Sequence, residues 1–154
     1  MGKRRKSREI AMQMLFQADL GRQSAEEVQR TFWQAREKID PDTQGFAEDL
    51  FRVAIARQEE IDGYIEKASQ NWRLERMAAV DRNLLRAAIG EMLAYPTTPL
   101  PVIINESLEI ARLYSASESI HFLNGILDAV ARAIPRTAKQ LGPRPAKESP
   151  AESD

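Results

Sequence analysis

The chain has 154 residues, of which 43% are apolar and 29% charged, as expected for one globular domain with a hydrophobic core. It contains no cysteine and one histidine, so disulfides, thiolate metal sites and zinc chemistry are not expected. No apolar run approaches the ~20 residues that span a bilayer, and no apolar signal segment opens the chain. We therefore expect a cytoplasmic protein without metal or cofactor.

The net charge of −1 conceals an uneven distribution. Residues 9–134 hold 13 Lys/Arg against 20 Asp/Glu, whereas residues 1–8, the basic arm, carry five cations: Lys3, Arg4, Arg5, Lys6 and Arg8. A basic arm on an acidic body is typical of a contact with a polyanion such as nucleic acid. A solvated terminus and a nuclear-import signal are the alternatives for the same residues.

The first half of the chain predicts several helices. Residues 3–6 are expected to be loose, with a first helix from Ser7 as N-cap to Gly21. Ser24 and Glu27 have the spacing of a capping box and open a second helix, which ends before Asp40. Residues 43–70 are predicted to form two helices with a break near 58–61.

A long central helix is predicted over 72–93, where apolar residues occupy an arc of about 180°. Asp81 falls in the middle of that arc, so its carboxylate is either satisfied inside the fold or serves a partner. Arg82 and Arg86 lie outside this arc, on a strip of the helix that is expected to be exposed to solvent.

Two more helices complete the prediction. One has Pro101 at its first position and Tyr114 on its inner face, and the last covers about 120–134, with Phe122 at the edge of its apolar stripe. Residues 135–154 are predicted to be a disordered tail. Because no segment alternates with period two, residues 1–134 are expected to form one all-α domain of about seven helices.

Catalysis finds little support in the sequence. It contains no phosphate loop, no nucleophile elbow and no cluster of histidines and carboxylates at metal spacing. The lone imidazole, His121, is most simply a surface residue. We therefore do not expect an enzyme.

Two aromatic rings are poorly explained by the apolar stripes of their own helices. Phe16 and Phe122 are either core residues or, if exposed near the basic arm, rings that stack an unpaired base of RNA. Asp81 is either a buried acid that caps a helix or pairs with an arginine, or a contact for a partner. Arg82 and Arg86 would extend such a partner contact.

Several short motifs occur together and in a fixed order. The first is Arg4-Arg5-Lys6-Ser7-Arg8-Glu9, followed by Ala11, Gln13, Leu15 and Phe16. The second comprises Asn71-Trp72, Leu74-Glu75-Arg76, Val80-Asp81-Arg82 and Leu84-Leu85-Arg86. The third comprises Ile104-Asn105-Glu106, Glu109, Ala111, Ser119, Phe122, Asn124-Gly125 and Leu127-Asp128. Over residues 4–134 the chain resembles the NusB family of transcription antitermination factors.

This resemblance implies two packed helical subdomains and a bacterial factor that binds boxA in nascent transcripts, notably ribosomal RNA leaders. It implies as partners the ribosomal protein NusE, other Nus factors and elongating RNA polymerase. The RNA contacts it implies are Lys3, Arg4, Arg5, Lys6 and Arg8, with Phe16 and Phe122. Asp81 corresponds to an acidic position toward NusE and RNA, and Arg82 is a neighbouring candidate.

The chain departs from the family pattern at two positions. Ser115 replaces a usual glycine, which puts the turn before the last helix in doubt, and His121 often has a cationic counterpart. Two alternative functions remain open. One is a relative of the accessory domain of ribosomal RNA methyltransferases, against which the lack of a methyltransferase domain argues. The other is a helical protein-interaction module without an RNA role. A homodimer is also possible.

Overall fold

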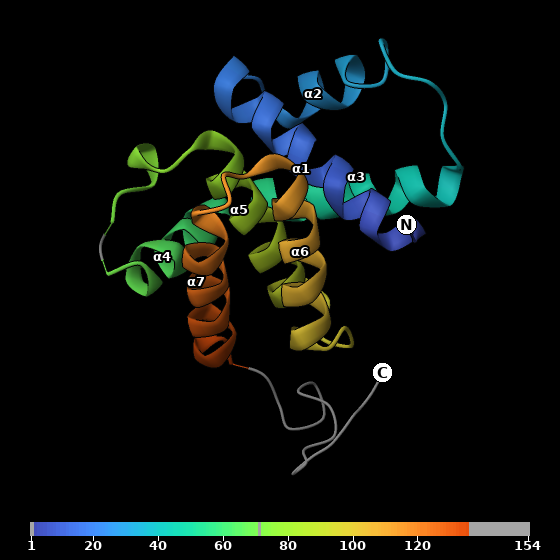
Figure 1. Ribbon diagram of the computed structural model, residues 1–154. Coiled ribbons are helices and arrows are strands. Elements are labelled where there is room, and N and C mark those ends of the chain that lie inside the picture. The colour runs from blue at the N-terminus through green and yellow to red at the C-terminus, as the bar shows by residue number, and fades with distance from the viewer. Residues whose placement is uncertain (1, 71, 136–154) are drawn as a thin grey trace.

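A computed structural model describes residues 2–70 and 72–135, and this part contains seven α-helices, one 3₁₀ turn and no strand. The elements are α1 (Lys3–Gly21), α2 (Ala25–Thr31), α3 (Pro41–Ala56), α4 (Gln58–Ala68), η1 (Leu74–Arg76), α5 (Ala79–Ala94), α6 (Leu100–Tyr114) and α7 (Ser119–Ala133) (Figure 1). The all-α class and the expected number of helices are confirmed. None of the helices described is long and apolar enough to cross a membrane.

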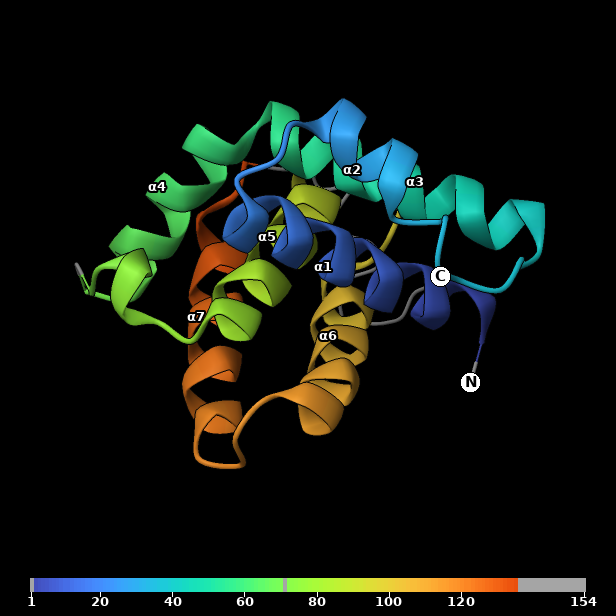
Figure 2. The ribbon, with the colours of Figure 1, turned by 90° about the horizontal axis from the view of Figure 1, so that it is seen from above.

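Helix α5 lies at the centre of the fold and contacts five other helices: α1, α3, α4, α6 and α7. Helices α1, α2 and α3 pack together as one subdomain, while α4, α6 and α7 pack around α5 as the second. Figure 2 shows α6 and α7 side by side, extending away from α1, α2 and α3. The two predicted subdomains therefore share one core, in which α5 is buried on nearly all sides.

The prediction of a loose basic arm is wrong, because α1 already begins at Lys3. Gly2 is the N-cap residue, and its carbonyl accepts the backbone N–H of Lys6 at 3.1 Å. Ser7, the predicted N-cap, is fully buried inside the helix and donates its hydroxyl to the carbonyl of Thr43 at 2.8 Å. This bond ties the first turns of α1 to α3.

The predicted central helix is also too long at its start. Leu74 and Met77 belong to the 3₁₀ turn and its extended exit, and α5 begins only at Ala79. Both side chains are nevertheless buried. An i, i+3 pair of apolar residues suits a 3₁₀ turn as well as an α-helix, which explains why the spacing predicted one continuous helix.

Several other predicted boundaries agree with the structure, although α2 ends at Thr31, well before the predicted limit of Asp40. The capping box of Ser24 and Glu27 is present, α1 ends at Gly21, and α3 and α4 separate at Arg57, next to the predicted break. Pro101 lies at the second position of α6, after Leu100, rather than at the predicted first position. Its missing N–H leaves no helical bond unmade there either. The predicted tail lies outside the described residues from position 136 onward.

Gly90 marks the close approach of α5 to α3. An added Cβ would lie 3.5 Å from the Cα and Cβ of Ala54 and 3.6 Å from Cδ1 of Ile61, which are ordinary contact distances. A methyl group therefore fits at this crossing, but a larger side chain does not.

We expect Gly90→Ala to raise the free energy of unfolding by about 0.5–1 kcal/mol, since alanine is the better helix former. Gly90→Leu should instead lower it by about 1–3 kcal/mol through overpacking. Urea denaturation of both variants checks this. A clear loss of stability in the alanine variant would contradict the described packing of α5 on α3.

Candidate functional site

Arg8 is the most deeply buried cation of the basic arm. Its guanidinium donates two hydrogen bonds to the carboxylate of Glu91 on α5, at 2.8 and 2.7 Å. The side chain of Arg8 is 10% exposed and that of Glu91 is 1% exposed. The pair therefore joins α1 to the central helix, and in this structure Arg8 presents almost no surface to a ligand.

Arg5 is held in a similar but more accessible pair. Its guanidinium donates to both carboxylate oxygens of Glu106 on α6, at 2.7 and 2.9 Å. Hydrogen bonding from Arg5 holds the pKa of the Glu106 carboxyl below its ordinary value, so this partner stays charged well into mildly acidic solution. Arg5 thus anchors α1 to α6 with about a third of its side chain exposed.

The other three cations of the arm, Lys3, Arg4 and Lys6, have side chains 62%, 51% and 47% exposed. Lys3 lies 3.2 Å from a carboxylate oxygen of Asp40, but the ion pairs that Arg4 and Lys6 form are 3.9 and 3.7 Å long. The carboxylates of Asp40 and Asp42 are exposed as well, and such exposed pairs contribute little free energy. Glu9, the partner of Lys6, has a side chain only 10% exposed. Lys3 and Arg4 are therefore free to exchange their carboxylates for another anion, while about half of the Lys6 side chain remains open to one.

The two candidate rings have different environments. Phe16 is half-buried on α1, whereas Phe122 is 40% exposed near the start of α7.

Tyr114, which was predicted on the inner face of α6, is 39% exposed, so that prediction is wrong. Its hydroxyl donates to Glu9 and accepts from the amide of Gln13 at 2.7 Å. Burial, with the bond to Glu9, raises the pKa of Tyr114 to about 12.

Asp81 is 5% exposed, in the first turn of α5. Its carboxylate accepts a hydrogen bond of 2.5 Å from the hydroxyl of Ser115, the residue that ends α6. Ser115 has a φ of −97°, an ordinary value for any residue, so this turn does not require the glycine usual in the family. His121 is exposed, as expected of a surface residue.

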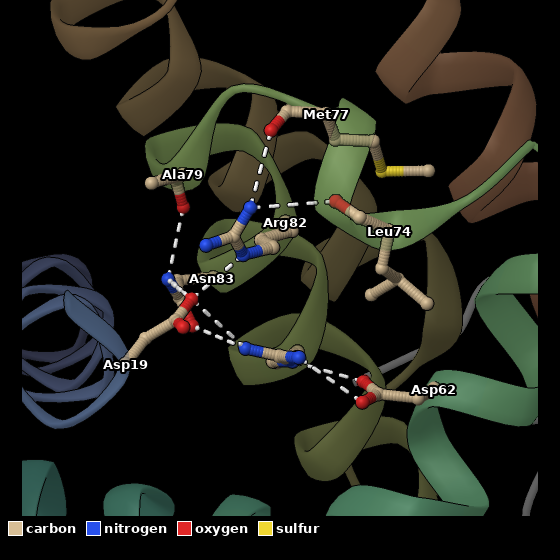
Figure 3. A network of polar contacts seen from close by, with 8 residues as sticks. Asp19, Asp62, Leu74, Met77, Ala79, Arg82 and Asn83 are labelled. Atoms are coloured by element: carbon tan, nitrogen blue, oxygen red, sulfur yellow. Dashed lines mark hydrogen bonds and ion pairs between the residues drawn. The ribbon is translucent and has the colours of Figure 1, made fainter. Parts of the chain in front are cut away.

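The strip of α5 that was predicted to be exposed to solvent is largely buried. Asn83 is fully buried, Arg86 is 7% exposed, and the side chain of Arg82 is 14% exposed. Asp19 of α1 accepts hydrogen bonds from all three side chains, and Arg86 also donates to Asp62 of α4 at 2.9 and 3.0 Å (Figure 3). This network joins the two subdomains through α5.

Arg82 is further fixed by the carbonyls of Leu74 and Met77, which accept from it at 3.4 and 3.3 Å (Figure 3). Burial alone would raise the pKa of Asp19, but the hydrogen bonds from Arg82 and Asn83 outweigh it and hold that pKa below its ordinary value. Both Asp81 and Arg82 therefore use their side chains for hydrogen bonds within the protein.

The described residues contain no group of three or more His, Asp or Glu side chains placed to hold a metal ion. The accessible chemistry of the first helical turns is instead cationic. Three flexible charges surround the start of α1, whose unpaired backbone N–H groups also favour anions. Such a surface can bind phosphate groups.

Sequence reasoning missed the partners that fix this surface. Glu106 and Gln13 were noted only as members of motifs, and Glu91 was not noted, since their pairing depends on the contacts of α1 with distant segments. Arg36 was also not noted, although one of its NH2 groups donates to Gln13 at 2.7 Å. Arg36 follows α2 in a charged loop and has no periodic pattern that could single it out.

The buried pair of Arg8 and Glu91 gives a direct stability test. Arg8→Met should lower the free energy of unfolding by about 3–5 kcal/mol, because it leaves Glu91 charged and unpaired in the core. The double substitution Arg8→Met with Glu91→Met should recover most of this loss. Calorimetry of the three proteins measures the effect, and equal stability of the wild type and Arg8→Met would contradict the pairing.

Comparison with known proteins places these features in a family. The model of the NusB family matches residues 5–132. The transcription antitermination protein NusB of Koribacter versatilis is 57% identical over 139 residues, which is 90% of this chain and 95% of the relative. The structure of T. maritima NusB is 33% identical with a TM-score of 0.76, over 84% of this chain and 90% of that one.

A crystal structure of antitermination factors NusB and NusE in complex with dsRNA has a matching chain with a TM-score of 0.79. That chain is 25% identical, and the match covers 87% of the present chain and 99% of its own length. The family match spans α1 to α7 almost completely. The chain therefore belongs to the NusB family.

Proposed function

We propose that this protein is a transcription antitermination factor that binds boxA-type RNA in nascent ribosomal transcripts together with NusE. The complex would join elongating RNA polymerase and other Nus factors in the bacterial cytoplasm. Two relatives carry the proposal: one is named an antitermination protein, and the other is described in complex with NusE and dsRNA. The proposal assigns the protein a binding role and no reaction.

The observation that carries the RNA-binding part is the cation cluster on the first turn of α1. Lys3, Arg4 and Lys6 are each about half exposed or more, on a helix that is already formed. A preformed helix avoids the entropy cost of ordering the backbone on binding. Phosphate groups would replace Asp40 and Asp42, whose exposed ion pairs contribute little.

Arg5 and Arg8 have a different role in this proposal. Their bidentate bonds to Glu106 and Glu91 orient the first turns of α1. Arg8 acts only by positioning the helix, since it is buried. Arg5 positions the helix as well and, because part of its side chain is exposed, can also meet a phosphate.

The rings supply contacts to bases. Phe122 is exposed enough for a base to stack on it, and Phe16 lies one helical turn beyond Gln13, on the same side of α1. Stacking on aromatic side chains favours unpaired bases, which supports single-stranded boxA rather than duplex RNA as the preferred ligand. Asp81 and Arg82 would support the NusE side by fixing the start of α5 rather than by direct contact.

The test replaces the three exposed cations together: Lys3→Gln, Arg4→Gln and Lys6→Gln. Binding of single-stranded boxA RNA should weaken about tenfold or more at moderate salt. The slope of log affinity against log salt should fall by about 2, because about three phosphate contacts are lost. Fluorescence anisotropy over a salt series measures both quantities. Deleting residues 1–8 is a poorer test, since Ser7 and Arg8 are buried.

A matched control carries Arg52→Gln, Arg57→Gln and Arg132→Gln, three arginines that each pair with a carboxylate three or four residues away along the chain. It changes the net charge equally and should retain affinity within about twofold. Equal weakening of the two triple variants would contradict a specific site at α1.

Adding NusE should tighten RNA binding by the wild type, and independent binding of NusE and RNA would contradict the joint complex. Light scattering at the working concentration shows whether a homodimer covers the surface.

A further inference from the structure

A groove runs between α1 and the segment that follows α2. Its volume is about 690 Å³, and its walls come from α1 and from the segment 32–39 that follows α2. The residues lining it are Lys6, Ile10, Gln17, Phe32, Trp33, Ala35, Arg36, Glu37 and Ile39. This volume lies within the range of about 300–1,000 Å³ typical of small-ligand sites, so the groove has room for a nucleotide.

Arg36 is held in an orientation that suits RNA. Its guanidinium lies over the ring of Phe32, 4.3 Å from the centroid, and one NH2 group donates to Gln13 of α1. Its backbone N–H donates to the carbonyl of Trp33 at 3.3 Å. Among the described residues its guanidinium forms no ion pair and no hydrogen bond besides the one to Gln13. A planar guanidinium fixed in this way can stack on a base or donate to a phosphate.

The groove is continuous with the proposed RNA surface. Lys6 belongs to the exposed cations of α1 and also lines this groove, while Arg36 lies across it on the opposite wall. Gln13 of α1 connects the two walls, since it accepts a hydrogen bond from Arg36. Its amide also donates to the hydroxyl of Tyr114 on α6. The groove thus offers two cations against one lining carboxylate, Glu37, on a body that is otherwise acidic.

The aromatic side chains give the groove an apolar floor. Phe32 is 7% exposed and packs edge to face against Trp33, with ring centroids 5.0 Å apart. The indole N–H of Trp33 donates to Glu48 of α3 at 2.8 Å, which fixes the ring. A rigid apolar floor with cations at its edge has the composition of single-stranded nucleic-acid sites.

We propose that this groove binds a nucleotide that flanks the core of the boxA RNA, with Arg36 as its main contact. The inference rests on the proposed RNA-binding function and extends its site across α1. It predicts that RNA lengthened at one end binds more tightly than the core sequence alone. The additional affinity would depend on the planar guanidinium of Arg36.

The experiment compares a core boxA RNA with versions lengthened by a few nucleotides at the 5′ or the 3′ end. For the wild type, one of the extensions should tighten binding about fivefold or more, a typical effect of one base stacked on a protein side chain. Arg36→Gln should lose this gain while its affinity for the core RNA stays within about twofold. Arg36→Lys, which keeps the charge but not the plane, should lose most of the gain.

Arg30→Gln is the matched control, because Arg30 is exposed on neighbouring α2 and does not line the groove. It should keep the full gain, and all variants should melt like the wild type. The inference is overturned if neither extension tightens binding, if Arg36→Gln keeps the gain, or if this variant loses only cooperativity with NusE, which would assign the groove to a protein. Failure of the wild type to bind the core RNA would instead contradict the proposed function itself.

Discussion

The buried ion pair between Arg8 and Glu91 is the interaction on which the rest of the structure depends. Two charges in the core are tolerated only when they are paired closely, and the bidentate geometry at 2.8 and 2.7 Å meets this requirement. The pair fixes α1 against α5, the helix that also contacts α3, α4, α6 and α7. A second buried network, centred on Asp19 and Arg86, fixes the other end of α1 to the same helix.

This anchoring explains how an acidic protein can present a cationic surface. Arg5 and Arg8 direct their charges inward to carboxylates, while Lys3, Arg4 and Lys6 remain about half exposed or more on the same turns. The inward pairs fix the position of α1, and the outward cations make its exposed surface positively charged. Carboxylates close to the outward cations weaken general attraction to polyanions, so a ligand must offer phosphates in matching positions.

The sequence predicted the all-α class, the number of helices, the capping box at Ser24 and the end of α1, because each depends on local spacing and capping chemistry. The cations of residues 3–8 were also identified in advance, whereas the sequence left open whether Phe122, which is 40% exposed, belongs to the core. It could not predict the inward partners of the arginines, since these lie about 80 to 100 residues away along the chain. Arg86 was predicted to be exposed for the same reason. Its position on the helix gives no sign that the carboxylates of Asp19 and Asp62 both bond to it.

Residues 3–8 form the first turns of a helix in the absence of RNA. Backbone chemical shifts of the free protein test this most directly. We expect helical Cα shifts for residues 4–8, with slow amide exchange at Ser7 and Arg8, both buried. Addition of boxA RNA should leave these shifts helical. Random-coil shifts in the free protein that become helical only with RNA would contradict a helix that is formed before binding.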